Sequence, residues 1–244
     1  MAVPSEYKKG CTDFLGCRID LRYRPLIPRV ETEEWVKAAL LEIDKLTYVR
    51  RSVNILDMFA GSGCVGVAVL KHVPESTMDF VDISPKCLKQ IEINCQLNKI
   101  AKERYRLIRA DVFGNCLREV CSTPKLAARY GVSPTSRYAS FCRAQYDFML
   151  ANPPYCQRQN VDHSVLKYEP HQAVLGGGKD GLRVIKKFLR EASKYLKPGG
   201  VIYLEFDDFQ KEALNKLLQR SKFKEWEFRK DQFGSWRCLK LEAR

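Results

Sequence analysis

The feature that most constrains the fold of this chain is the alternation of short apolar runs with longer amphipathic segments. Apolar runs of strand length occupy residues 53–58, 78–81, 106–110, 148–151 and 201–206. Helical periodicity covers residues 31–49, 64–71, 85–98, 182–196 and 210–219. We therefore predict an α/β fold with a mostly parallel sheet and helices on both faces. Two final runs, 224–230 and 235–242, have no helix between them and are expected to form an antiparallel hairpin.

A short motif predicts where one of the helices ends. The helix over residues 182–196 meets Lys197-Pro198-Gly199-Gly200, a sequence that is typical of a helix end. The strand over residues 201–206 is then expected to begin directly after these glycines. In sheets of this kind, ligands bind at the carboxyl ends of the strands, so residues that follow the strands are the candidates for function.

Length and composition narrow the class of protein. The 244 residues suit one large α/β domain or two small ones, and an apolar share of 45% excludes wholesale disorder. No segment approaches the roughly 20 apolar residues of a membrane span, and the N-terminus has no apolar signal-peptide core. We expect a soluble intracellular protein without a membrane partner. Its ten cysteines are expected to be reduced thiols rather than metal ligands, because no C-x-x-C pair occurs.

Positive charge is the strongest compositional signal. The net charge of +13 favours polyanionic surroundings such as RNA or a ribosome, although a solvated basic surface explains it equally well. Residues 115–144 form an unusually long connection between two predicted strands, with five basic side chains against one acid. We expect this segment to be a basic insertion that faces a partner.

A glycine-rich loop follows the first strand of the predicted sheet. Gly61-Ser62-Gly63-Cys64-Val65-Gly66 matches the pattern G-x-G-x-x-G, and Asp82 ends the next strand 21 residues after Gly61. This pattern is typical of a cofactor that contains a nucleoside, and it also fits a nicotinamide dinucleotide. The loop alone therefore does not choose between cofactors.

Three aspartates help to choose the cofactor. Asp57, Asp82 and Asp111 end successive strands, which would align their carboxylates along one edge of the sheet. Asp82 would accept from both ribose hydroxyls, Asp111 would accept from an adenine amino group, and Asp57 suits a positively charged ligand. One aspartate alone would more often be a cap or turn residue. Together they favour S-adenosylmethionine, which carries two cationic groups and no phosphate, over a dinucleotide.

The tetrapeptide Asn152-Pro153-Pro154-Tyr155 follows the next apolar run and reaches the same edge. A planar NH2 group is a poor nucleophile, and acceptors on both of its N–H bonds would orient its nitrogen toward a methyl donor. The Asn152 side-chain oxygen and the Pro153 carbonyl can be these acceptors, because prolines hold the backbone rigidly. Tyr155 offers a flat wall for an amide or a base. Taken alone, the tetrapeptide would read as a strand-ending turn.

Several stretches of the chain resemble the HemK/PrmC family, the release factor glutamine N5-methyltransferases. The matching stretches are residues 26–33, 56–63, 81–84, 111–113, 152–155, 168–170 and 173–182. The last of them contains Gly176-Gly177-Gly178-Lys179-Asp180-Gly181-Leu182 and is the most specific, because generic amino-methyltransferases lack it. The resemblance implies a Rossmann-like class I methyltransferase with a seven-stranded sheet. Residues 1–30 would form an N-terminal β-hairpin extension, and residues 31–244 the methyltransferase domain.

The resemblance also implies an activity and a set of site residues. The substrate would be the glutamine in the Gly-Gly-Gln loop of a class I peptide chain release factor, with S-adenosyl-L-homocysteine as the second product. The implied catalytic residues are Asn152, Pro153, Pro154 and Tyr155. The implied cofactor-binding residues are Asp57, Phe59, Ala60, Gly61, Ser62, Gly63, Asp82, Ile83, Asp111, Val112 and Asn152. The implied substrate-binding residues are Arg29, Glu33, Asn152, Pro153 and Tyr155.

The chain departs from the family pattern in four places. Phe59-Ala60 stands where smaller residues are usual, so the fit around the methionine end of the cofactor is expected to differ. The family's N-terminal helical bundle, which is associated with gripping the release factor, has no counterpart in residues 1–30. Glu33-Glu34-Trp35 and the 115–144 insertion resemble a fungal mitochondrial member. We expect a monomer in the mitochondrial matrix, with the cytoplasm as the alternative.

Other functions stay open at this point. An adenine N6-methyltransferase acting on DNA or RNA uses the same tetrapeptide, but it needs a region that reads and flips a base, and only residues 156–244 follow Tyr155. A non-catalytic ribosome- or RNA-binding protein with this fold would be expected to have lost Asn152 or Asp82. An NAD-dependent dehydrogenase would need a hydride-transfer residue beside the tetrapeptide.

Overall fold

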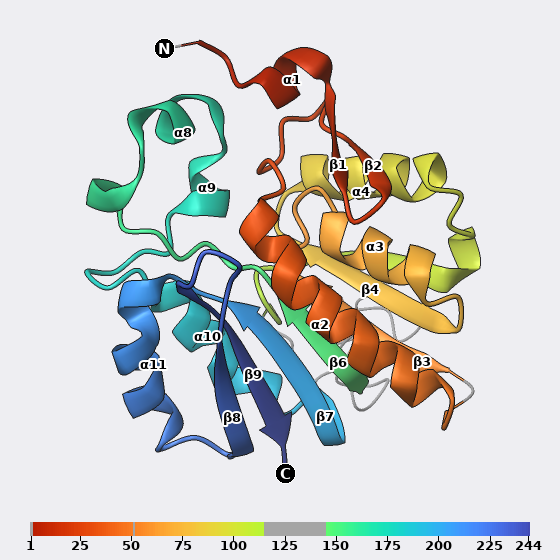
Figure 1. The fold of residues 1–244 in the computed structure, drawn as a ribbon, viewed down its shortest axis with the longest axis vertical. Coiled ribbons are helices and arrows are strands. Elements are labelled where there is room, and N and C mark those ends of the chain that lie inside the picture. Colours follow the sequence, from red (N-terminus) through yellow and green to blue (C-terminus); the bar gives the residue numbers. More distant parts are fainter. Residues whose placement is uncertain (1, 51, 115–144) are drawn as a thin grey trace, which may run out of the picture.

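The computed structural model describes residues 2–50, 52–114 and 145–244, and its centre is one seven-stranded sheet (Figure 1). The strands are β3 (Val53–Met58), β4 (Ser76–Asp82), β5 (Tyr105–Arg109), β6 (Tyr146–Ala151), β7 (Leu196–Glu205), β8 (Phe223–Lys230) and β9 (Trp236–Ala243). Their order is β5-β4-β3-β6-β7-β9-β8. The first five pair in parallel, and β9 runs antiparallel to both β7 and β8. The predicted α/β fold with a C-terminal hairpin is confirmed.

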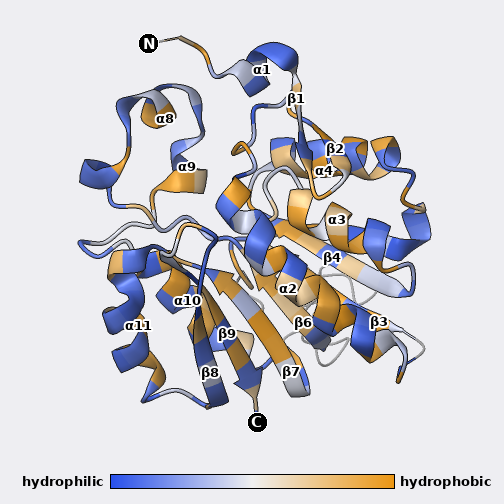
Figure 2. Cartoon of the chain, in the orientation of Figure 1, coloured by the Kyte–Doolittle hydropathy of each residue, from blue (hydrophilic) through white to orange (hydrophobic). Residues whose placement is uncertain are grey.

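The sheet is covered on both faces by helices. These are α2 (Val30–Thr47), α3 (Cys64–His72), α4 (Pro85–Leu97), α10 (Arg183–Ala192) and α11 (Lys211–Leu218). Successive strand residues point to opposite faces. Ile55 therefore packs in a core with α2, α3 and α4, whereas Leu56 packs in a second core with α10 and α11. Figure 2 shows apolar residues concentrated on the central strands and hydrophilic residues on the outer helices.

The prediction for the end of the helix before β7 was wrong. Helix α10 ends at Ala192, and Lys197-Pro198-Gly199-Gly200 lies inside β7 instead of stopping a helix. The reason is strand pairing, because the Tyr146 amide already donates to the Tyr195 carbonyl at 2.8 Å. Tyr146 pairs with Leu196 and Phe148 with Val201, so residues 197–200 of β7 are accommodated by a register shift between Tyr146 and Phe148 on β6.

The N-terminal segment forms a small hairpin that packs on α4. It contains α1 (Ser5–Lys9), β1 (Cys11–Phe14) and β2 (Cys17–Asp20). Asn94, which is fully buried on α4, accepts from the Asp20 amide at 2.8 Å and donates to the Ser62 carbonyl at 2.8 Å. One amide side chain therefore fixes the hairpin relative to the glycine loop.

Short helices between β6 and α10 lie beyond the carboxyl ends of the strands (Figure 1). They are η2 (Arg158–Asn160), α8 (His163–Tyr168) and α9 (His171–Val174), while η1 (Lys102–Arg104) and η3 (Asp208–Gln210) precede β5 and α11. Periodicity did not predict them, because such short segments contain too few residues to show a pattern. The predicted insertion at 115–144 lies outside the described residues. No helix in the described part of the chain is long and apolar enough to cross a membrane.

Candidate active site

A cavity of about 890 Å³ opens at the carboxyl ends of β3, β4 and β6. This is where strand order reverses between β3 and β6, which is the usual ligand position in such sheets. The structure brings most of the predicted site residues together around it. Those that line the cavity are Arg29, Asp57, Phe59, Ala60, Gly61, Ser62, Asp82, Ile83, Asp111, Val112, Asn152 and Pro154.

Four predicted residues are not among those that line the cavity. Gly63 lies beneath the loop, where an added Cβ would meet Ile91 Cγ1 at 3.0 Å. Glu33 faces along α2 toward Lys37, with 3.9 Å between its carboxylate and the ammonium group. Pro153 is buried, and the Tyr155 hydroxyl points to Glu205. The roles predicted for Glu33 and the Tyr155 ring in binding a substrate therefore stay predictions.

The glycine loop needs its glycines for conformation and for close packing. Gly61 and Gly63 have φ angles of 56° and 79°, in the left-handed region that side chains disfavour. Gly66 lies so close to β4 that an added Cβ would meet the Phe80 ring at 2.3 Å. The loop can therefore wrap tightly over the ends of β3 and β4.

Phe59, which with Ala60 is predicted to depart from the family pattern, lies in this loop. It adopts a φ of 64°, which strains a non-glycine backbone by about 1–2 kcal/mol. Its ring packs edge-on against Phe188, with 5.9 Å between the ring centres. Much of its extra bulk is therefore accommodated by the core beneath the cavity.

Asp57 combines a structural and an electrostatic property. Its side chain is buried and accepts from the Gly66 amide at 2.9 Å, which caps the first turn of α3. Burial, with the nearby Asp82 carboxylate as a further cause, raises the pKa of Asp57 to about 8. A cationic ligand would favour its ionised form, whereas a pyrophosphate would oppose it.

Asp82 and Asp111 differ in how firmly they are held. Asp82 accepts from the Gly61 and Ser84 amides, both at 2.8 Å, and burial raises its pKa. Asp82 also lines the cavity, where its carboxylate would accept from a ribose hydroxyl. Asp111 is 62% exposed and pairs with Lys187 at 2.7 Å. Asp111 is therefore less constrained than Asp82 as an acceptor for adenine.

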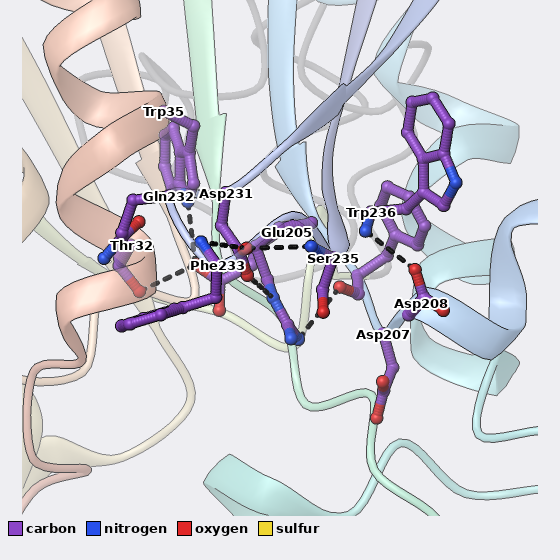
Figure 3. Close-up of polar contacts among 12 residues, drawn as sticks. Thr32, Trp35, Glu205, Asp207, Asp208, Asp231, Gln232, Phe233, Ser235 and Trp236 are labelled. Carbon is purple, nitrogen blue, oxygen red and sulfur yellow. Dashed lines mark hydrogen bonds and ion pairs between the residues drawn. The ribbon is translucent and has the colours of Figure 1, made fainter.

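The tetrapeptide is held by a buried carboxylate that sequence reasoning missed. Glu205, the last residue of β7, accepts from Thr32 Oγ1 at 2.7 Å, from Trp35 Nε1 at 2.7 Å and from the Tyr155 hydroxyl at 2.9 Å. Figure 3 shows Thr32 and Trp35 reaching Glu205 from α2. Burial raises the pKa of both Glu205 and Tyr155. Asn152 joins this network through its amide nitrogen, 3.3 Å from Thr32 Oγ1.

The glycine-rich loop after α9 clamps the backbone of the tetrapeptide. An added Cβ on Gly176 would lie 2.8 Å from the Pro154 carbonyl oxygen, and one on Gly181 would lie 2.2 Å from that of Tyr155. Gln210, also missed from the sequence, donates to the Tyr155 and Asp180 carbonyls, both at 2.9 Å. The loop must contain glycines because two backbones touch here.

Glu169 holds together two segments that line the outer side of the cavity. This buried carboxylate accepts from Arg29 at 2.5 Å and from the Ile27 amide at 3.0 Å. It joins the segment before α2 to the segment between α8 and α9. Arg29 lines the cavity, but its guanidinium is already engaged by Glu169.

The residues present fit S-adenosylmethionine better than a dinucleotide. The hydrogen-bond partners of Asp57 and Asp82 within the described residues are neutral groups, so a cationic ligand would not compete with a bound arginine or lysine. Asp57 and the glycine loop would hold the methionine end, and Asp82 the ribose. Ile83, which is 48% exposed, and Val112 provide apolar surface for a base.

One of the missed residues left a signal in the sequence. Glu205 is the one acid in the apolar run Val201-Ile202-Tyr203-Leu204-Glu205-Phe206. A carboxylate in a buried strand needs a reason, because burying it unpaired is costly. Thr32 lies within the 26–33 stretch, although nothing local in the sequence indicates that it meets Glu205.

Comparison with known proteins identifies related methyltransferases. A family model described as methyltransferase small domain matches residues 37–122. The chain is 31% identical over 243 residues to the release factor glutamine methyltransferase of Thermodesulfovibrio yellowstonii, covering 98% of this chain and 76% of that protein. It is 30% identical over 243 residues to that of Coxiella burnetii, covering 97% and 74%.

Solved structures support the fold. The catalytic domain of hMettl16 aligns with a TM-score of 0.60 at 12% identity, covering 94% of this chain and 76% of that one. A ribosomal protein L11 methylase from Lactobacillus delbrueckii subsp. bulgaricus aligns with a TM-score of 0.57 at 13% identity, covering 93% and 84%. The predicted class I fold and the predicted S-adenosylmethionine-dependent methyltransferase are confirmed. The chain belongs to the release factor glutamine methyltransferase family.

Proposed function

We propose that this protein methylates the side-chain amide nitrogen (N5) of the glutamine in the Gly-Gly-Gln loop of a class I peptide chain release factor, and thereby modulates translation termination. The observation that carries the proposal is the clamped tetrapeptide beside the acidic end of β3 and β4. Gln210 and the loop at 176–182 immobilise its backbone, and Asn152 lines the cavity next to the predicted cofactor residues. The names of the relatives support the same substrate.

The residues of the site would orient the acceptor amide. S-adenosylmethionine, when bound, supplies an electrophilic methyl group on a cationic sulfur. Asn152 Oδ1 would accept a hydrogen bond from one N–H of the glutamine amide, and the Pro153 carbonyl would accept one from the other N–H. Two acceptors in these places favour the nitrogen lone pair as nucleophile and stabilise the positive charge that develops on nitrogen. The nitrogen then loses one proton to solvent, so no strong base is required.

The proposal extends to partners and compartment. Basic side chains at the rim of the cavity, Arg22, Arg24, Lys86 and Lys167, together with the net charge of +13, support a further contact with the ribosome or RNA. We propose a monomer of the fungal mitochondrial branch that acts in the mitochondrial matrix. Cell fractionation of the tagged protein, with a cytoplasmic pool as the contrary result, tests the compartment.

A labelled-methyl assay tests the proposed reaction. Purified protein and radiolabelled S-adenosylmethionine are offered a release factor, the same factor with Gln→Ala in its Gly-Gly-Gln loop, and DNA and RNA oligomers in parallel. We expect label on the intact release factor alone. Equal label on the Gln→Ala factor, or label on nucleic acid, would show that the acceptor is a different group.

A further inference from the structure

The Asn152 carboxamide poses an orientation problem. Its oxygen and nitrogen ends have nearly the same size and shape, but only the oxygen can accept an N–H bond from a substrate amide. A carboxamide turned the wrong way would present two N–H donors to the NH2 group that it must bind. Some feature of the protein must therefore select one of the two orientations.

The hydrogens available around Thr32 make this selection. A threonine hydroxyl has one hydrogen to donate, and Thr32 donates it to Glu205 Oε2 at 2.7 Å. Trp35 Nε1 can only donate, and it fills the same carboxylate oxygen at 2.7 Å. Thr32 Oγ1 is left with lone pairs alone. Its other neighbour, 3.3 Å away on Asn152, must therefore be the donating nitrogen, which turns Asn152 Oδ1 away from Thr32.

The fold holds these groups together from three elements. In the pairing of β6 with β7, Ala151 lies opposite Leu204, so Asn152 and Glu205 follow side by side. Thr32 and Trp35 lie three residues apart on α2 and share the face that meets β7. Gln232, in the β8–β9 turn, donates to the Val30 carbonyl at 3.0 Å and so holds the first turn of α2.

Burial keeps water from competing for these bonds. Thr32 and Glu205 are each 1% exposed, and Trp35 is 3% exposed. In the described part of the chain the hydrogen-bond partners of Glu205 are all neutral. Arg237 bonds to Asp231 and to the Phe206 carbonyl, and it acts on Glu205 through its charge without a hydrogen bond. A hydrophobic residue at such a position would often give a more stable fold than a buried carboxylate, so we infer that Glu205 has a function.

We propose that Glu205 and Thr32 form a positioning relay that holds the Asn152 carboxamide with its oxygen toward the substrate. Neither residue needs to touch the reacting atoms. Glu205 orients the Thr32 hydroxyl, Thr32 orients Asn152, and the second oxygen of Glu205 holds Tyr155 at the other end of the tetrapeptide. The relay deepens the proposed function, because an orientation-dependent acceptor is needed only for an N–H substrate.

The matched pair Thr32→Val and Thr32→Ser tests the relay by kinetics. Valine has the shape of threonine without its hydroxyl, and serine restores the hydroxyl. We expect Thr32→Val to lower kcat by about 10–100-fold, as is typical for outer groups that orient a site residue, while KM for the release factor and Kd for S-adenosylmethionine change less than about two-fold. Thr32→Ser should recover most of the rate. Equal kcat in Thr32→Val and wild type would overturn the relay.

A second measurement is independent of any methyl acceptor. Proton exchange of the Asn152 carboxamide can be followed by NMR in the wild-type protein, with its signals assigned by their loss in Asn152→Asp. We expect exchange at least about ten-fold slower than for an exposed asparagine, because one N–H is bonded to buried Thr32. Fast exchange in the wild type would overturn the relay even if Thr32→Val failed to fold. A release factor that remained unmethylated would refute the proposed function. The exchange rate of the Asn152 carboxamide would still test the relay, because it does not depend on a methyl acceptor.

Discussion

Carboxylates on the parallel strands have different partners in the two halves of the sheet. Toward the amino ends, Asp147 pairs with Arg50 and with Lys197 at 2.7 Å, and it also accepts from the Asn54 amide at 2.9 Å. Asp79, in the same half, pairs with Arg106 and accepts from the Tyr146 hydroxyl at 2.6 Å. Each of these carboxylates has a cation of the protein beside it.

Toward the carboxyl ends, the carboxylates that lie on the parallel strands themselves have neutral hydrogen-bond partners. Asp57 and Asp82 accept from backbone amides, and Glu205 accepts from Thr32, Trp35 and Tyr155. The pKa values of all three are raised by burial. Asp57 and Asp82 line the cavity without a protein cation among their hydrogen-bond partners in the described residues, which leaves a place for a cationic ligand. We infer that one half of the sheet is built for stability and the other for binding and catalysis.

The largest effect is expected from Asn152→Ala at the carboxyl end. Removing the acceptor that orients the substrate amide should lower turnover by about 10²–10³-fold. The affinity for S-adenosylmethionine should stay within a few-fold, because the glycine loop and Asp82 are untouched. Single-turnover methylation and calorimetry measure the two quantities. Turnover that equals that of the wild type would remove Asn152 from the mechanism.

At the amino ends, Asp147→Ala should act on stability alone. Two cations and the Asn54 amide lose their acceptor, so the free energy of unfolding should fall by about 3 kcal/mol. Urea unfolding measures this change, and Asp44→Ala, at an exposed position on α2, is the matched control. A large loss of cofactor affinity without a loss of stability would contradict the division between the two halves.

Asp82→Ala should produce the reverse pattern. The loss of a charged acceptor for the ribose hydroxyls should weaken S-adenosylmethionine binding by roughly 10–100-fold. The loss of its bonds to the Gly61 and Ser84 amides should lower stability less than Asp147→Ala does. Calorimetry measures the affinity. An unaltered Kd would mean that the ribose is held elsewhere.

The smallest effect concerns pH and Asp57. Burial raises the pKa of Asp57 to about 8, so the stability that its protonated form contributes is complete below the ordinary carboxyl pKa and is lost as pH rises through about 8. A cationic ligand favours the ionised form, so cofactor affinity should rise several-fold from about pH 6.5 to about pH 8.5. Asp57→Asn should flatten both trends in thermal unfolding and calorimetry. A wild-type Tm that does not fall over this range would place the Asp57 pKa elsewhere.

Much of the fold and part of the site could be predicted because their signals are local. The period of apolar residues marks strands and helices wherever they are long enough, and parallel strands necessarily bring their carboxyl ends to one edge. Asp57, Asp82 and Asn152 therefore gather at one cavity, as predicted. The short helices α8 and α9 and the early end of α10 were not foreseen, because pairing and packing outweigh local preference there.

What the sequence settled was which residues reach the carboxyl edge of the sheet. What only the tertiary structure decided was which way their side chains turn once they arrive. Thr32 and Glu205 are 173 residues apart, and Arg29 and Glu169 are 140 apart. Such contacts depend on how α2 is rotated against β7 and on how the segment between α8 and α9 packs over the cavity. Hydrogen bonds are directional and short, so the partners of Tyr155 and Asn152 follow from packed geometry, which no local pattern of residues contains.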